Sequence, residues 1–308
     1  MFVLHMIVGI RFIYGINIHI YVIQYTKCEP IKITNRNELQ QLVKRFNFKG
    51  NGTKQNPYVI ENLYVVTDEL HDGIVFENIT DYCIIRHCIV EYEKKPYVVP
   101  MMDGIYLNHC ANFAIEYNII KNSYGGIYVQ KCQNITIKYN YCEGHKDANR
   151  NIQIDGNNIV VIGNICTDAS HGIHIINCTN SFIYNNYCID NFMYGIYVTL
   201  SHHIIISYNV IKRSDKSCVM LHLETNWIIL YNNILCHSEQ IILYMQNCIR
   251  HVIFMNNLLY TFDRTDDEWV KQYKPIILTR WFDNIHVLHV FDIAFIVNGK
   301  VDGIAIMK

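Results

Sequence analysis

Acidic residues recur in the middle of the chain, each placed a few residues after a short strand-like run. They are Glu143, Asp147, Asp168 and Asp190, followed by Arg213 and Asp215. Two carboxylates can act as general acid and base on a glycosidic bond, and carboxylate oxygens also bind Ca²⁺. Asp168, Asp190 and Arg213 are therefore the candidate catalytic residues. The alternative is that these acids are ordinary solvated loop residues.

A second set of polar and aromatic residues keeps a fixed distance from a recurring strand-opening position. Two residues after it stand Tyr106, Tyr128, Gln153, His174, Tyr197, Met220 and Tyr244, and four residues after it stand Asn108, Gln130, Asp155, Ile176, Thr199, His222 and Gln246. Tyrosine rings beside hydrogen-bonding groups suit a sugar chain. We take Tyr106, Tyr128, Asp155, His174, Tyr197 and His222 as the candidate binding residues. The alternative is that Tyr recurs because it is a good strand residue.

The strand-opening position belongs to a repeat that would position both sets. Five glycines, Gly73, Gly104, Gly126, Gly172 and Gly195, precede similar strand-like runs. Seven asparagines (Asn118, Asn140, Asn164, Asn186, Asn209, Asn232 and Asn257) follow in step, at intervals of 22, 24, 22, 23, 23 and 25 residues. Such self-similarity marks a stacked solenoid. The alternating, β-branched runs indicate three short strands per coil, as in a parallel β-helix.

The asparagine column has a physical reason. Stacked strands lie about 4.8 Å apart, so identical amides can hydrogen-bond from coil to coil. Asparagine also tolerates the left-handed backbone conformation that a tight bend between sheets needs. We therefore expect these asparagines to form a ladder at a bend.

The repeats G-I-x-[VIL] and N-x-I-x-I-x-x-N over residues 73–260, with the lead-in GNGTKQNPYVIENLYV, resemble a known group of proteins. The group is the right-handed parallel β-helix proteins of the pectate-lyase-like superfamily, especially NosD-like repeat proteins. The resemblance implies an all-β, single-stranded right-handed parallel β-helix of about eight or more coils.

The resemblance leaves three functions open because this fold carries many activities. The first is a non-catalytic β-helix that binds a glycan, or serves a structural role, at a cell or virion surface. The second is a polysaccharide lyase or glycoside hydrolase acting on an acidic polysaccharide, for which the lyases of the fold use Ca²⁺. The third is a NosD-like accessory protein. No lyase or polygalacturonase motif is visible, so the first is our leading hypothesis.

Composition excludes other classes. The net charge is −1 with no basic run, so no nucleic-acid partner is expected. Neither His171 and His174 nor the pair His202 and His203 supplies a three-ligand spacing, so no metal site and no cofactor are predicted.

The 12 cysteines fall into columns of the repeat. Cys110, Cys132, Cys178 and Cys248 share one slot, and Cys142, Cys166 and Cys188 share another. Cysteine in an interior column behaves as a small hydrophobe. Adjacent coils would also bring Cys110 and Cys132 within disulfide range, so buried thiols and a disulfide both stay open.

The ends differ from the repeat. Residues 1–25 are apolar enough for a signal-anchor or a first packed strand, which favours an exported, membrane-anchored or virion-surface protein. Residues 26–72 hold a first coil and a capping helix over 34–47, with Thr34 or Asn35 as N-cap and Leu39, Leu42, Val43 and Phe46 on its apolar face. Residues 73–260 form the β-helix, and residues 261–308 form a charged loop with degenerate coils or a cap.

The second strand of each coil carries an apolar stripe on its outer side. Its predicted members are Val160, Ile162, Phe182, Tyr184, Ile205, Ile228, Leu230, Ile253 and Met255. A contiguous apolar stripe on an outer face marks an interaction surface. It predicts a homo-oligomer, with the N-terminal segment or the C-terminal tail as alternative covers.

Overall fold

The computed structural model describes residues 3–6, 23–93, 102–145, 148–236, 241–246, 250–261, 277–280, 288–291, 293–297 and 300–305. The predicted charged loop over 261–275 lies outside these residues except for Thr261, and so do the acid Asp147 and Cys248.

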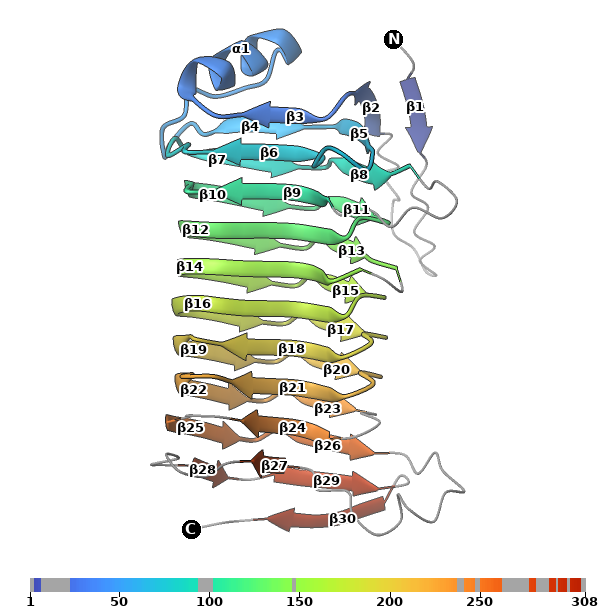
Figure 1. Ribbon diagram of the computed structural model, residues 1–308, viewed down its shortest axis with the longest axis vertical. Coiled ribbons are helices and arrows are strands. Elements are labelled where there is room, and N and C mark those ends of the chain that lie inside the picture. Colours follow the sequence, from blue (N-terminus) through green and yellow to red (C-terminus); the bar gives the residue numbers. More distant parts are fainter. Residues whose placement is uncertain are drawn as a thin grey trace, which may run out of the picture.

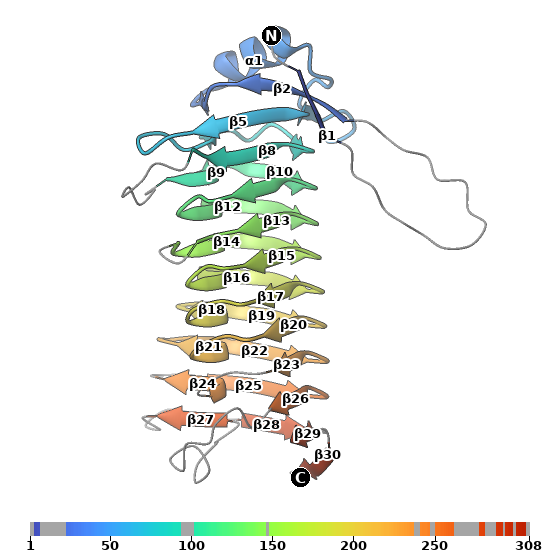
Figure 2. The ribbon, with the colours of Figure 1, turned by 90° about the vertical axis from the view of Figure 1, so that its right-hand side faces the viewer.

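The chain forms an upright stack of at least eight coils, each made of three short strands (Figure 1). Strands of successive coils pair in parallel, so three ribbons of strands run along the stack (Figures 1 and 2). This confirms the predicted all-β parallel β-helix.

We call the three ribbons the first, second and third sheets, in the order in which each coil visits them. The first sheet contains β3 (Ile31–Ile33), β6 (Ile74–Glu77), β9 (Asp103–Asn108), the first parts of β12 (Gly125–Lys138), β14 (Arg150–Ile162) and β16 (His171–Tyr184), β18 (Tyr194–Thr199), β21 (Ser217–His222), β24 (Ile241–Gln246) and β27 (Ile277–Arg280). The second contains β4 (Tyr58–Glu61), β7 (Cys83–Arg86), β10 (Ala111–Glu116), the later parts of β12, β14 and β16, β19 (His202–Ser207), β22 (Asn226–Tyr231), β25 (Arg250–Met255) and β28 (Leu288–Phe291). The third contains β2 (Ile23–Cys28), β5 (Leu63–Thr67), β8 (Ile89–Tyr92), β11 (Ile119–Lys121), β13 (Tyr141–Glu143), β15 (Ile165–Thr167), β17 (Tyr187–Ile189), β20 (Val210–Lys212), β23 (Ile234–Cys236), β26 (Leu258–Thr261) and β29 (Ile293–Val297), with β1 (Val3–Met6) and β30 (Lys300–Ala305) antiparallel at its two ends.

The core is a set of aliphatic columns inside the coils. Ile105 and Leu107 point inward on β9, and their register partners Ile127 and Val129 do so on β12; all four are fully buried. Alternate residues point in opposite directions along a strand, so one side of every strand fills the core. The predicted inward positions after the strand-opening glycine are confirmed.

The asparagine ladder is present, with one correction. The amide of Asn186 donates to Asn209 Oδ1 at 3.0 Å, and that of Asn209 donates to Asn233 Oδ1 at 3.0 Å. The rung is therefore Asn233, which is 1% exposed, and the prediction of Asn232 was wrong. The same bond joins every rung from Asn118 to Asn257.

The ladder residues do not adopt the left-handed conformation that we expected. The residue before each rung does so, as in Tyr117 (φ 55°), Asn185 (φ 56°) and Asn232 (φ 54°). The bend is thus made one residue earlier, because the rung must turn its side chain inward to reach the next amide. In the coil before Asn118 the rung position is Cys88, whose backbone N–H donates to Asn118 Oδ1 at 2.9 Å.

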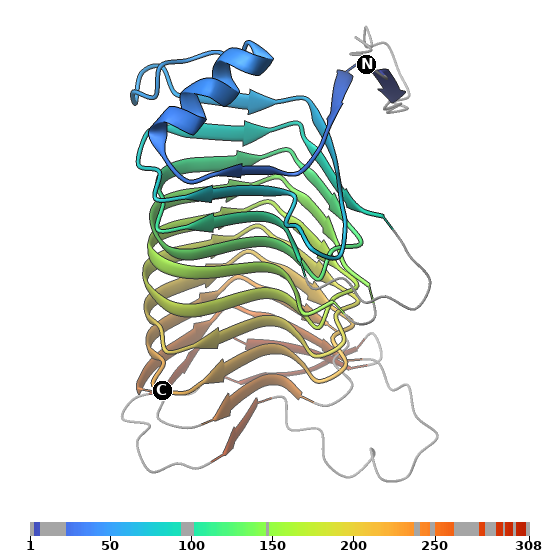
Figure 3. The ribbon, with the colours of Figure 1, turned by 45° about the horizontal axis from the view of Figure 1, so that its top comes forward.

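Helix α1 (Arg36–Phe46) lies over the N-terminal end of the stack (Figure 3). Its N-cap is Asn35, whose side chain accepts from the Glu38 N–H at 3.1 Å, while Glu38 accepts from the Thr34 N–H at 2.7 Å. This pair resembles a capping box, except that Glu38 accepts from the residue before the N-cap. Leu39 and Leu42 are buried against the first coil, so the helix covers apolar surface that a terminal coil would otherwise expose.

Only part of residues 1–25, the predicted signal-anchor or first packed strand, lies within the described residues. Strand β1 pairs antiparallel with β2, while residues 7–22 lie outside the described residues. Within the described part of the chain, none of the helices combines the length and the apolar character needed to cross a membrane.

The cysteines of the described coils are free thiols, and all but Cys28 are buried. Cys142, Cys166 and Cys188 form one inward column. Cys110 donates its backbone N–H to Cys132 Sγ at 3.2 Å. The cysteine columns are therefore part of the core, as expected.

The outer apolar stripe of the second sheet is present with two corrections. Ile228 and Leu230 point inward and are fully buried, so the stripe instead continues through Ile229 and Tyr231. The cause is a bend in this coil that is one residue longer than in the preceding coil, with both Leu223 (φ 40°) and Glu224 (φ 43°) in the left-handed conformation. Phe182, the most open member of the stripe, is 44% exposed.

Candidate functional site

The outer face of the first sheet carries a column of rings and polar side chains in exact register from coil to coil. Tyr106 pairs with Tyr128, and His174 pairs with Tyr197, with Gln153 between the two pairs. The ring centroids of Tyr106 and Tyr128 are 5.1 Å apart, and those of His174 and Tyr197 are 4.7 Å apart. The structure thus brings four predicted binding residues into one platform.

The other two predicted binding residues differ in their surroundings. His222 joins the platform, because its Nδ1 lies 2.8 Å from the Tyr197 hydroxyl. Asp155 turns toward the bend between the first and second sheets, where it accepts hydrogen bonds from the Asn177 side chain and the Lys131 backbone. Asp155 therefore stabilises the bend. Burial raises its pKa, against the effect of these partners.

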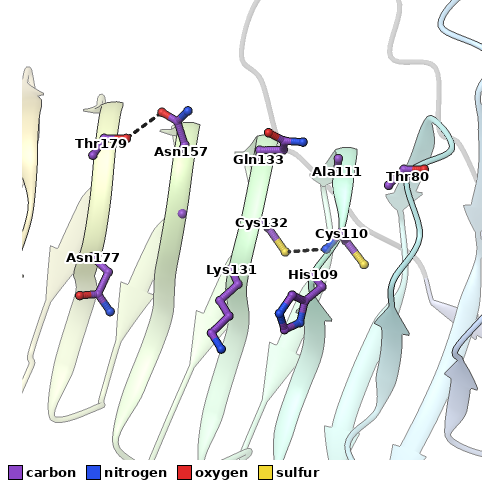
Figure 4. Close-up of a pocket in the computed structure, with 11 residues that line it drawn as sticks. Thr80, His109, Cys110, Ala111, Lys131, Cys132, Gln133, Asn157, Asn177 and Thr179 are labelled. Atoms are coloured by element: carbon purple, nitrogen blue, oxygen red, sulfur yellow. Dashed lines mark hydrogen bonds between the residues drawn. The ribbon is translucent and has the colours of Figure 1, made fainter.

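The bend at Asp155 is one residue shorter than its neighbours and contains Gly156 at φ 148°. A side chain on Gly156 would lie 1.9 Å from the Cys132 carbonyl oxygen. The shortened bend leaves an open hollow of about 410 Å³. Figure 4 shows Lys131 and His109 lying side by side along it in adjacent coils, with Asn177 two coils from Lys131, beyond the coil of Asn157.

A third column consists of the first residues of successive strands in the first sheet, and the sequence analysis did not identify it. In successive coils it contains Asp103, Gly125, Arg150, His171 and Tyr194. Each of these residues directly precedes the strand-opening position of its coil, and that constant spacing could have identified them. Together with the ring column they form a continuous surface, which we call the first-sheet face.

Asp103 and Arg150 reach each other across Gly125. A side chain on Gly125 would lie 1.8 Å from Asp103 Oδ1. The guanidinium of Arg150 lies 3.6 Å from that oxygen, and both side chains are 12% exposed. The same guanidinium lies 4.6 Å from the ring centroid of Tyr128, a distance typical of cation–π contact.

The imidazoles of the face are held neutral. Burial lowers the pKa of His174 to about 3, and burial also lowers the pKa of His171. His171 Nδ1 lies 3.0 Å from the Asn149 carbonyl oxygen, which can only accept. The proton of neutral His171 therefore stays on Nδ1, and Nε2 carries the lone pair. Rings of His174, Tyr194 and Tyr197 pack around it at 5.3–5.5 Å.

The predicted catalytic residues lie in a different place, at the bend after the third sheet. Asp168, Asp190 and Arg213 all have positive φ, between 52° and 59°, and occupy equivalent positions in successive coils. Arg213 Nη2 donates to Asp190 at 2.6 Å, and this ion pair lowers the pKa of Asp190. Asp168 accepts from the Thr167 hydroxyl at 2.6 Å. In the described residues no hydrogen bond or ion pair joins Asp168 to Asp190.

Known proteins agree with this fold. Residues 142–265 match the family NosD, described as a periplasmic copper-binding protein. The Dettilon tailspike protein gp208 superposes with a TM-score of 0.59 at 13% identity, over 78% of this chain and 53% of that one. The A-module of mannuronan C-5 epimerase AlgE4 from Azotobacter vinelandii gives 0.51 at 11% identity, over 80% and 83%.

The tailspike of E. coli bacteriophage HK620, solved with a pentasaccharide, gives a TM-score of 0.51 at 9% identity, over 76% of this chain and 62% of that one. This chain thus spans about half of the Dettilon tailspike. At such identities the likeness shows the fold alone. No curated protein matches the chain in sequence.

The copper in the NosD description does not fit the residues seen here. Among the described side chains, no group of three or more His, Cys, Asp or Glu is placed to hold a metal ion. Burial raises the pKa of Cys142, Cys166 and Cys218, which keeps these thiols protonated and poor as ligands.

Proposed function

We propose that this chain, a parallel β-helix protein with NosD-like repeats, binds a polysaccharide along its first-sheet face. The observation that carries the proposal is the register of the rings of Tyr106, Tyr128, His174 and Tyr197 beside buried polar groups. Sugar rings need a flat apolar surface and nearby hydrogen-bond partners, and this face offers both. Solved tailspikes of this fold hold oligosaccharides, which supports the proposal.

The test is a glycan array followed by calorimetric titration of the best oligosaccharide. Tyr197→Ala removes a ring from the centre of the platform and should weaken binding about tenfold, which corresponds to about 1.4 kcal/mol. Tyr187→Ala is the matched control, because Tyr187 is 42% exposed but lies on the third sheet. Equal effects of the two substitutions would reject the first-sheet face as the binding surface.

A second candidate function is conversion of an acidic polysaccharide. The observation that favours it is the column of Arg150, His171 and Tyr194, with the His171 Nε2 lone pair available. Arg150 can neutralise the carboxylate of a uronate, while His171 removes the proton from the adjacent carbon as a base. Departure of the glycosidic oxygen then leaves a carbon–carbon double bond, and Tyr194, the register partner of His171, would return a proton to the leaving oxygen.

An ultraviolet assay for unsaturated uronate products tests this second candidate. His171→Ala should abolish turnover while glycan binding persists. The prediction that Asp168, Asp190 and Arg213 are catalytic stays a prediction, and turnover that survives Asp168→Ala and Asp190→Ala would reject it. Calcium would enter only through the lyase alternative. The accessory role in the manner of NosD also stays a prediction.

The partner and compartment follow from the same proposal. The polysaccharide would be a cell-surface or extracellular glycan, so we propose that the protein is exported. The apolar stripe of the second sheet supports the proposal of a homo-oligomer, with Phe182 and Ile229 at the contact.

A further inference from the structure

We propose that Asp103 is an internal counter-ion of Arg150, and that it occupies the position against the guanidinium that an anionic group of a ligand would take. The inference rests on the proposed first-sheet face for its biological ligand, a sugar carrying a carboxylate or sulfate. Its test uses an inorganic anion and therefore does not depend on that proposal.

The first argument is the path between the two side chains. Asp103 and Arg150 are register partners of Gly125 in the coils on either side. They are two coils apart and meet only because Gly125 has no side chain between them. The carboxylate thus fills the space left by the missing side chain of Gly125, and the guanidinium that it faces lies over the ring of Tyr128.

The second argument is that this ion pair is incomplete. At 3.6 Å the contact is longer than a hydrogen bond, whereas Arg86 and Glu61 meet at 2.8 Å. Asp103 Oδ1 and Arg150 Nε are both buried and have no hydrogen-bond partner. A guanidinium has five N–H donors in a planar fork that matches a carboxylate or sulfate. An incoming anion could therefore make hydrogen bonds that Asp103 does not make.

The third argument is the electrostatic surroundings of Asp103. Asp72, from the preceding coil, accepts the Asp103 backbone N–H at 2.7 Å. Burial raises the pKa of Asp103 to about 6; Arg150 opposes this shift and Asp72 adds to it. The other titratable groups facing the pair are Tyr106, Tyr124, Tyr128, His171 and His174.

These facts make anion binding dependent on pH. Proton uptake by Asp103 from water removes its charge and releases Arg150 for the anion. With a pKa of about 6, Asp103 is about one-thirtieth protonated at pH 7.5 and about nine-tenths protonated at pH 5. If the anion enters only after protonation, its apparent affinity should rise about 30-fold between these pH values.

The experiment is a titration with sodium sulfate at constant ionic strength, followed by the NMR signal of the Arg150 side-chain Nε–H. In the native protein we expect the sulfate-dependent shift to saturate at about 30-fold lower sulfate concentration at pH 5 than at pH 7.5. In Asp103→Asn we expect the tighter value at both pH values. Glu116→Gln removes a comparable acid, paired with Lys138 at 2.8 Å on the second sheet, and should behave as the native protein does.

Several results would overturn the inference. Equal affinity of the native protein at the two pH values would show that Asp103 does not compete with the anion. Weaker binding in Asp103→Asn would show that Asp103 positions Arg150 instead. If sulfate shifts the Arg150 signal at neither pH, Arg150 does not bind the anion. A normal sulfate result without any oligosaccharide binding would reject the proposed function and leave the counter-ion inference intact.

Discussion

Replacing Asn186 by alanine tests the ladder most directly. Asn186 is fully buried. Its amide donates to Asn209 Oδ1 at 3.0 Å and to the Val161 carbonyl at 2.9 Å, and its oxygen accepts the Asn164 backbone N–H at 2.9 Å. Alanine would remove all these bonds.

The cost follows from the groups that lose their partners. Asn164 loses the acceptor of its backbone N–H, and Val161 loses the amide that binds its carbonyl. The Asn164 side chain keeps its bond to the Ile137 carbonyl, and Asn209 Oδ1 keeps the Asn186 backbone N–H. Each buried polar group left unpaired costs about 1–3 kcal/mol, so Asn186→Ala should lower the free energy of unfolding by about 2–6 kcal/mol.

The assay is equilibrium unfolding in urea, followed by circular dichroism and tyrosine fluorescence. Asn185→Gly is the matched control, because Asn185 is the adjacent exposed residue with φ 56°, a conformation that glycine adopts freely. We expect the control to change stability by less than about 0.5 kcal/mol. A loss below about 1 kcal/mol for Asn186→Ala, or equal losses for both variants, would refute the role assigned to the ladder.

Three further predictions concern other parts of the molecule. The pKa of Asp103 in the folded protein, about 6, exceeds the ordinary aspartate value, so ionisation of Asp103 destabilises the fold as the pH rises between these two values. Asp103→Asn should therefore add on the order of 1–3 kcal/mol to the free energy of unfolding at pH 7.5 and nothing at pH 4, measured by urea unfolding at both pH values. The exposed pair of Asp190 and Arg213 should contribute less than about 1 kcal/mol, so a large loss of stability in Arg213→Ala would contradict its description as a surface ion pair. Light scattering should give a mass above the 36.3 kDa of one chain, and Phe182→Lys should lower it, whereas a monomer with the stripe open would reject the oligomer.

The fold could be predicted from the sequence because each coil repeats the same local pattern. Errors arose where neighbouring residues were chemically alike. Asn232 and Asn233 are both asparagines, and only the bend decides which one turns inward. Ile228 and Leu230 were assigned to the outer side because the longer bend at Leu223 and Glu224 shifts the alternation by one residue.

The first-sheet face could be predicted in part. The ring column follows from strand alternation, so Tyr128 and Tyr197 were identified from spacing alone. The contact of Asp103 with Arg150 spans two coils and depends on the missing side chain of Gly125. No local pattern reveals a contact between residues 47 positions apart, although their shared place before the strand-opening position was visible.

The ladder also gives the solenoid a direction. Between neighbouring rungs from Asn118 to Asn257, the amide N–H always donates to the oxygen of the next rung toward the C-terminus, so the amide-to-amide bonds form a one-way chain. A rung turned the other way would set two oxygens or two N–H groups against each other. A coil that follows the ladder must therefore supply an amide oxygen, whereas the coil that precedes it needs only backbone groups: the Cys88 N–H donates to Asn118 Oδ1, and the Ile85 carbonyl accepts from the Asn118 amide. This asymmetry explains why Cys88, which has no amide, can begin the chain at the N-terminal end.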